Sequence, residues 1–253
     1  MANFIVLRES PDWATFDLEQ TRPFLRSHNL DEDLVIAFAR IWDATFRLDY
    51  CTVRACLKAL TMEMVHAVRG ATLLTFEAFD PGAVTAGDRI VFQDDDDWPS
   101  PLLFETLDLS PHADGYRWGS LRIGLDFDVT ARGAGILSQR PISPFVYTNN
   151  YAVDGAALNR LGVDAFFDHG PANGAFGSAG FVVADRTEYL SCAVKHPCST
   201  VAIKAALSDP NFLRDPAGFI APLIKGLDDA QPSGPAAWTA APVAALRDIL
   251  HAL

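Results

Sequence analysis

The chain has 253 residues, 49% of them apolar, which is enough to bury the core of one large α/β domain. Its 20 basic and 32 acidic residues give a net charge of −12, which argues against a nucleic-acid or anionic-membrane partner, because both require clustered basic residues. Neither a signal peptide nor an apolar run of the roughly 20 residues that span a bilayer is evident. We therefore expect a single cytoplasmic domain with no nucleic-acid partner and no stable membrane insertion.

Residues 1–100 are expected to form a nucleotide-binding half of this domain. Residues 3–7 are a short apolar run, which predicts a buried strand with Arg8 at its carboxyl end. Apolar positions spaced by three and four predict an amphipathic helix over 31–46, and a second helical stretch over 51–69 stops at Gly70. A further apolar, β-branched run over 89–93 predicts another buried strand.

Residues 101–227 are expected to form the half that holds the acceptor and the donor sugar. The predicted elements are a half-exposed strand over 121–129, a helix capped by Asp154 that ends at Gly162, a glycine-rich loop over 170–180, strands over 181–184 and 189–194, and a helix over 199–206. Residues 228–253 are expected to be a linker, over 228–241, and a C-terminal helix. This order of elements predicts an α/β fold with a Rossmann-like mixed sheet flanked by helices.

Four consecutive aspartates, Asp94 to Asp97, begin where the strand over 89–93 stops. In open α/β sheets ligands collect at the carboxyl ends of strands. Adjacent carboxylates repel one another unless solvent, a helix N-terminus or a cation offsets the repulsion, and Mg²⁺ or Mn²⁺ does so while also binding phosphate oxygens. The run therefore favours a divalent-metal site, with a solvated acidic turn as the alternative.

The segment FQDDDDWP, residues 92–99, resembles the GT-A glycosyltransferases, in which apolar residues precede Asp-x-Asp-Asp and an aromatic residue and a proline often follow. The opening FIVLR and the acidic run together resemble a group of bacterial rhamnosyltransferases. The resemblance covers these two segments, and the rest of the chain only by element order. It implies a GT-A-like fold, a nucleotide-sugar-dependent hexosyltransferase activity, and Mn²⁺ or Mg²⁺ as the cofactor.

The resemblance also implies roles for individual residues of the run. Asp94 would contact the nucleotide on its ribose or base side and share in metal binding, and Asp96 would bind the metal that bridges the two phosphates. Asp97 would support these ligands or contact the donor sugar, while Asp95 faces away. Arg8 is similar to the family's nucleotide-contacting position, although a surface arginine is the alternative.

A further metal ligand in the family, commonly a histidine, lies near the C-terminal end of the domain, and His196 is the candidate for it here. It lies at a predicted strand-to-helix junction, where a neutral imidazole can bind a metal. Lys195, Ser199, Thr200 and the free N–H groups of the new helix can face a phosphate there. The alternative is a loop histidine with Ser199 as a helix cap.

Glycosyl transfer with inversion needs a base that takes the proton of the acceptor hydroxyl. Asp168 is the first candidate, because an apolar pair precedes it and glycines follow it, and Glu188 is the second. A cap or turn role is the alternative for Asp168. Four further residues are expected to bind the sugar substrate, with an asparagine-rich turn as the alternative for the last three: Trp98, Asn149, Asn150 and Tyr151.

Three classes of function remain open at this point. The first is a metal-dependent glycosyltransferase that moves a sugar from a nucleotide-sugar to a carbohydrate acceptor, such as a glycan or a cell-surface polysaccharide. The second is a metal-dependent phosphoryl-transfer or hydrolytic enzyme, in which Asp126, Asp128 and Asp168 would supply further acids. The third is a non-enzymatic calcium- or carbohydrate-binding module.

Overall fold

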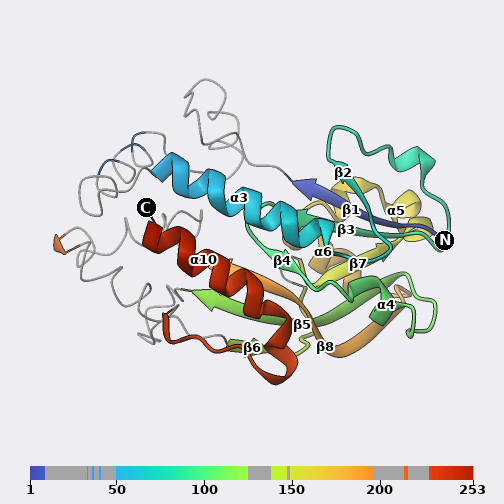
Figure 1. Ribbon diagram of the computed structural model, residues 1–253. Helices are drawn as coiled ribbons and strands as arrows, with labels where there is room; N and C mark the ends of the chain where they lie inside the picture. The colour runs from blue at the N-terminus through green and yellow to red at the C-terminus, as the bar shows by residue number, and fades with distance from the viewer. Residues whose placement is uncertain are drawn as a thin grey trace.

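Strand β1, Asn3–Arg8, lies inside a mixed sheet that organises the whole structure (Figure 1). The structure is a computed structural model that describes residues 1–8, 33, 36, 40, 50–124, 138–146, 149–195, 214–215 and 228–252. Almost all of the predicted helix over 31–46 and all of that over 199–206 lie outside the described residues.

The sheet has the order β2-β1-β3-β7-β5-β8-β4, with β6 paired to β5 beside this path. Its strands are β1 Asn3–Arg8, β2 Thr72–Thr75, β3 Arg89–Asp94, β4 Trp98–Pro99, β5 Gly115–Gly124, β6 Ser138–Arg140, β7 Tyr151–Asp154 and β8 Val183–Lys195. The described helices are α3 Tyr50–His66, α4 Leu103–Leu107, α5 Gly155–Leu161, α6 His169–Phe176 and α10 Ala240–Ala252. Short 3₁₀ turns are η2 Pro81–Ala83, η3 Val163–Ala165 and η4 Gly234–Thr239.

The directions of the strands bring several carboxyl ends to one edge of the sheet. Strand β1 is parallel to β2 and to β3, and β5 is parallel to β8. Strand β7 is antiparallel to both β3 and β5, so β1, β3, β5 and β8 all run in the same direction. The mixed sheet and its helices make this an α/β fold, as the order of elements predicted, and are consistent with a Rossmann-like class.

Both faces of the central strands are covered, which explains their continuous apolar sequences. Successive side chains of a strand point to opposite faces, so Ile5 packs in one buried cluster with Val65 of α3, and Val6 packs in another with Phe166 and Phe176. Helices α3 and α10 lie side by side (Figure 1). Among the described helices, none combines the length and the apolar character that crossing a bilayer requires.

Several predicted elements are confirmed. The predicted strand over 3–7 is β1, and the predicted strand over 89–93 is β3. Each is one residue longer at its carboxyl end, so β1 ends at Arg8 and β3 at Asp94. Asp154 caps α5 by accepting a hydrogen bond of 2.8 Å from the backbone N–H of Ala156. The helix stops at Leu161 with Gly162 as its C-cap, and the φ of 84° at Gly162 favours glycine. The helix predicted over 51–69 is α3, which ends earlier, at His66.

Three predictions need correction. The glycine-rich loop predicted over 170–180 is wrong for residues 170–176, because helix α6 occupies His169–Phe176, where burial of Ala172 and Phe176 offsets the low helix propensity of glycine. The two strands predicted over 181–184 and 189–194 are one strand, β8. The linker over 228–241 contains η4 and the start of α10. The strand predicted over 121–129 is β5, which starts earlier, at Gly115. Its predicted alternation is confirmed over 121–123, where Leu121 and Ile123 are buried and Arg122 is partly exposed, while residues 125–129 lie outside the described residues.

Candidate metal centre

The candidate site lies where β1 and β3 end together. In the parallel register of these strands Arg8 is opposite Asp94, the last residue of β3. The chain then turns over the next three aspartates and enters β4, whose Trp98 pairs antiparallel with Cys192 of β8. This tight turn brings acids that are adjacent in sequence against the carboxyl-terminal part of β8.

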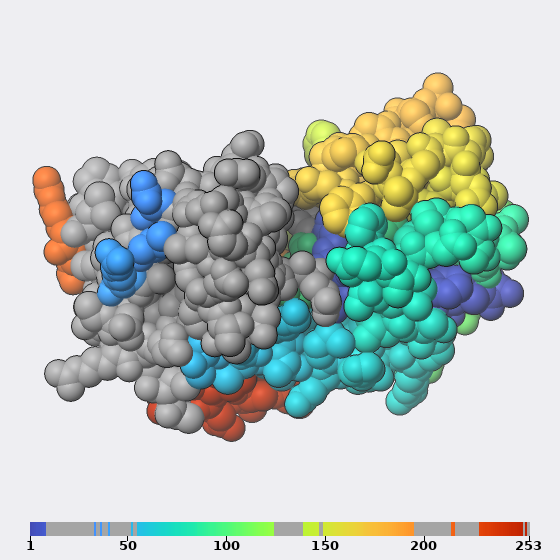
Figure 2. Space-filling view, turned by 90° about the horizontal axis from the view of Figure 1, so that it is seen from above, coloured from blue at the N-terminus to red at the C-terminus, as the bar shows by residue number. Residues whose placement is uncertain are grey.

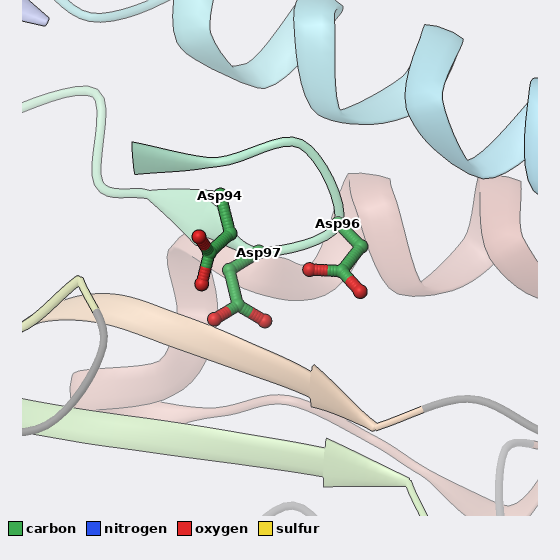
Figure 3. A group of neighbouring side chains, drawn as sticks. All are labelled: Asp94, Asp96 and Asp97. Atoms are coloured by element: carbon green, nitrogen blue, oxygen red, sulfur yellow. The ribbon is translucent and has the colours of Figure 1, made fainter. Parts of the chain in front are cut away.

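Three of the four aspartates converge there. Ligand oxygens of Asp94, Asp96 and Asp97 all lie within 4.8 Å of one another. Figure 3 shows their carboxyl groups in the space between the acidic turn and strand β8. Asp97 is fully buried, whereas Asp94 and Asp96 are partly exposed, so the group can be reached from solvent. Asp95 is buried and does not belong to this group, in agreement with the expectation that it faces away.

Asn149 holds two of these carboxylates together. Its side-chain nitrogen donates a hydrogen bond to Asp97 Oδ2 and contacts Asp94 Oδ2 at 3.4 Å, while its side-chain oxygen accepts the backbone N–H of Asp94 at 2.9 Å. Asn149 is 2% exposed and has a φ of 66°, a left-handed conformation that asparagine tolerates better than most residues. The buried amide therefore offsets part of the repulsion between Asp94 and Asp97.

The backbone also orients Asp97. The N–H of Val194 in β8 donates a hydrogen bond of 2.8 Å to Asp97 Oδ1. The side-chain nitrogen of Gln93 donates to the carbonyl oxygens of Asp97, at 3.0 Å, and Asp94, at 3.2 Å, which closes the turn. Each carboxylate oxygen has two lone pairs, so the Asp97 carboxylate can accept the hydrogen bonds from Val194 and Asn149 and also bind a cation.

Arg8 supplies positive charge next to Asp94. Its Nη2 lies 2.6 Å from Asp94 Oδ1, and its side chain is only 12% exposed. Its Nη1 donates to the carbonyl oxygen of Phe167, and its guanidinium lies over the Phe167 ring, 5.6 Å from the centroid. Arg8 thereby connects the acidic turn to the segment that precedes α6.

All four predicted sugar-binding residues are buried, and Asn149 among them bonds to the acids of the site. Trp98 and Tyr151 are each 1% exposed, and Asn150 is 3% exposed. Burial raises the pKa of Tyr151 well above its ordinary value, and the charges of Asp94 and Asp168 add to this effect while Arg8 opposes it. The Tyr151 hydroxyl donates to the carbonyl oxygen of Phe166. These positions pack the core beside the site, because β4 and β7 are covered on both faces.

The two candidate bases differ in position. Asp168 is the N-cap of α6 and is exposed, next to the Phe167 carbonyl that Arg8 contacts. Glu188 pairs with Arg186 and lies six positions before Val194, roughly 20 Å along an extended strand. Burial raises the pKa of Glu188, but hydrogen bonds from Arg186 and the backbone outweigh it and lower that pKa. The structure therefore brings Asp168 near the site and leaves Glu188 away from it.

The remaining predicted residues are placed only in part. Lys195 is the last residue of β8, one position beyond Val194. His196, Ser199 and Thr200, like Asp126 and Asp128, lie outside the described residues. The clamping role of Asn149 was not predicted, and neither was a partnership between Asp168 and His169. In both cases the only signal in the sequence is a polar side chain beside a turn or a cap.

The donor set suits a hard divalent cation. Three carboxylates supply oxygen ligands only, the type that Mg²⁺ and Mn²⁺ prefer, and the partial exposure of two of them leaves room for water or phosphate oxygens. Neither models of known protein families nor curated proteins match the chain. The geometry of the site is therefore the basis for a functional assignment.

Proposed function

We propose that the protein is a metal-dependent glycosyltransferase that uses a nucleotide-sugar donor and a carbohydrate acceptor. The observation that carries the proposal is the convergence of Asp94, Asp96 and Asp97 at the carboxyl end of β3. Ligands of open α/β sheets bind at this edge. The resemblance of residues 92–99 to the GT-A enzymes points to the same chemistry, and the mixed sheet is compatible with their fold.

The charge of the site favours a cation together with a diphosphate. A diphosphate alone would be repelled by three converging carboxylates, so its binding here requires a divalent ion between the two groups. Asp94, Asp96 and Asp97 would hold that ion, which would be Mn²⁺ or Mg²⁺. When bound, the ion would neutralise the charge that develops on the leaving diphosphate.

The protein's own residues would then orient the donor. Asn149 and the N–H of Val194 fix the Asp97 carboxylate, so the metal ligands are held in place before the nucleotide arrives. Arg8 lies beside Asp94, where its guanidinium can contact the nucleotide. Figure 2 shows a hollow between the yellow and teal segments, with blue atoms of β1 at its base, and we place the donor there.

A nucleotide screen tests this function. We expect a nucleoside diphosphate or nucleotide-sugar from a panel of uridine, guanosine and thymidine compounds to raise the melting temperature with Mn²⁺ and to raise it little without Mn²⁺. Asp96→Asn should strongly reduce the shift, whereas Asp164→Asn, which removes one exposed acid elsewhere, should preserve it. The absence of any Mn²⁺-dependent shift in the native protein would contradict the proposal.

The same preparation distinguishes the other enzyme class. A phosphoryl-transfer or hydrolytic enzyme would release phosphate from a generic phosphate ester in the presence of Mn²⁺. A glycosyltransferase would instead release a nucleoside diphosphate from the nucleotide-sugar that stabilises it best. Phosphate release without this second reaction would favour the hydrolytic function.

A further inference from the structure

We propose that His169 is the general base that deprotonates the acceptor hydroxyl, and that Asp168 positions the His169 ring. This inference rests on the proposed glycosyl transfer. It changes the expected role of Asp168, from the group that takes the proton to the group that orients the one that does. The two side chains contact each other, and α6 begins beside the candidate metal centre.

The two side chains form a hydrogen-bonded pair. Nδ1 of His169 lies 2.7 Å from Asp168 Oδ1, and the same oxygen accepts the backbone N–H of His169 at 2.6 Å. Donation from Nδ1 to a carboxylate leaves Nε2 as the acceptor nitrogen of the neutral ring. The side chain of His169 is 51% exposed, so an incoming hydroxyl can reach the ring.

Two connections hold the start of α6 against the candidate site. Arg8 contacts both the Phe167 carbonyl, which immediately precedes Asp168, and the Asp94 carboxylate. On the other side, the Asn173 side chain exchanges hydrogen bonds with the backbone of Val146, at 2.7 and 2.8 Å, and donates to the His169 carbonyl at 2.8 Å. Val146 lies three residues before Asn149, which clamps Asp94 and Asp97.

This geometry favours the histidine over the aspartate as the base. Asp168 Oδ1 already accepts two hydrogen bonds, one of which caps α6. A neutral imidazole oriented by a carboxylate is well suited to accept a proton near neutral pH. Asp168 would then stabilise the positive charge that appears on the ring, as a carboxylate does in other acid–histidine pairs.

The proposed step is a single displacement. The proton of the acceptor hydroxyl passes to Nε2 of His169 as the acceptor oxygen bonds to the anomeric carbon. The bond from that carbon to the diphosphate oxygen breaks, and its electron pair leaves with the nucleoside diphosphate. The proton on His169 is afterwards released to solvent, so neither an oxidant nor a further reactant is needed.

The test compares His169→Ala, His169→Gln and Asp168→Asn with the native protein. The assay is Mn²⁺-dependent release of nucleoside diphosphate from the nucleotide-sugar that stabilises the protein best, with water as the acceptor. We expect both His169 variants to lower kcat by about 100-fold or more and to keep the Mn²⁺-dependent thermal shift with nucleoside diphosphate. Added imidazole should partly restore turnover in His169→Ala, which a purely structural role for the ring would not allow.

Asp168→Asn keeps a good helix cap, so it tests positioning without loss of α6. We expect it to lower kcat less than the His169 variants do and to leave KM for the donor unchanged. Abolished turnover in Asp168→Asn together with near-native turnover in both His169 variants would overturn the inference and make Asp168 the base. Native turnover in all three variants would overturn it as well. If the native protein binds the donor and metal without turnover, or binds neither, the proposed function fails and the inference fails with it.

Discussion

The side-chain amide of Asn149 donates a hydrogen bond to the carboxylate of Asp97, across 52 residues of sequence. Asp97 is fully buried, and a buried carboxylate needs such donors to remain charged. The same amide reaches Asp94, so one side chain from the segment before β7 holds the last residue of β3 and an acid of the turn that follows it. The candidate metal centre is therefore assembled by the packing of the sheet as well as by the acidic run.

Replacing Asn149 tests this clamp. Asn149→Gly should lower the free energy of unfolding by about 1.5–3 kcal/mol, because two carboxylates lose a hydrogen-bond donor. Asn149→Ala should lower it by about 1 kcal/mol more, since alanine is strained at a φ of 66° whereas glycine is not. Urea unfolding measures both values. Equal stability of the two variants would contradict the strained conformation, and native stability of both would contradict the clamp.

Arg8 should not be replaceable by lysine. A lysine ammonium cannot reach both the Phe167 carbonyl and Asp94 with the geometry of a guanidinium, so Arg8→Lys should detach the start of α6 from β1. We expect faster hydrogen exchange at the Ala172 amide, which bonds the Asp168 carbonyl at 3.0 Å in the first turn of α6.

Arg160→Lys is the matched control for this replacement. Arg160 pairs with Asp114 at 3.0 Å at a position where the arginine side chain is 52% exposed. Exposed pairs contribute about 0–1 kcal/mol, so this control should leave α6 exchange unchanged. Unaltered exchange at Ala172 in Arg8→Lys would show that Arg8 does not tie α6 to the sheet.

Replacement by alanine should have opposite effects on stability at Gly155 and at Gly174. A Cβ at Gly155 would lie 2.1 Å from the Thr85 carbonyl oxygen, so Gly155→Ala should destabilise the protein by about 1–3 kcal/mol or more. Gly174, inside α6, has open space around such an atom, and Gly174→Ala should stabilise the protein by about 0.5–1 kcal/mol. Thermal unfolding with calorimetry measures both changes, and a stabilised Gly155→Ala would contradict the close approach of α5 to the 85–88 turn.

The sequence predicts the central strands because both of their faces are buried, which leaves continuous apolar runs such as residues 3–7 and 89–93. It predicts α5 because a capping aspartate and a terminal glycine bound it. It misses α6, where three glycine and proline residues suggest a loop and only the burial of Ala172 and Phe176 stabilises the helix. Local propensity is therefore overridden by packing there.

The candidate site likewise contains residues that local sequence predicts and residues that only tertiary packing reveals. Asp94, Asp96 and Asp97 are adjacent in sequence and follow a strand, so their convergence can be predicted locally. Asn149 could be chosen only as a polar residue, because its contact with Asp97 depends on the antiparallel placement of β7 beside β3. Trp98 and Tyr151 are aromatic residues of the kind that bind sugars, but the packing of the sheet buries them. Tertiary contacts of this kind leave no local pattern.

The lowered pKa of Asp88 leads us to expect that the fold loses stability in acid. Burial raises its pKa, but hydrogen bonds from the Ala2 and Thr85 backbone and from the Thr85 hydroxyl outweigh this and hold the pKa below the ordinary 3.8. A lowered folded pKa stabilises the fold above the unfolded value, and that stability is lost as the pH falls through the folded value.

The corresponding test is urea unfolding between about pH 6 and pH 3, a range that covers the ordinary pKa of an aspartate. Asp88→Asn should be less stable than the native protein at pH 6, and the difference should shrink as the pH falls below about 4. A difference that is the same at every pH would show that the charge of Asp88 does not contribute.

Titration calorimetry of the nucleoside diphosphate selected by the thermal screen tests the metal centre most directly. The native protein and the charge-matched Asp164→Asn control should bind it with Mn²⁺ and release little heat without Mn²⁺. Asp96→Asn should lose at least about 10-fold in affinity, equivalent to about 1.4 kcal/mol, because one of three converging carboxylates is removed. Binding that needs no Mn²⁺, or equally tight binding by Asp96→Asn, would contradict the assignment of Asp94, Asp96 and Asp97 as the metal ligands of a nucleotide-sugar enzyme.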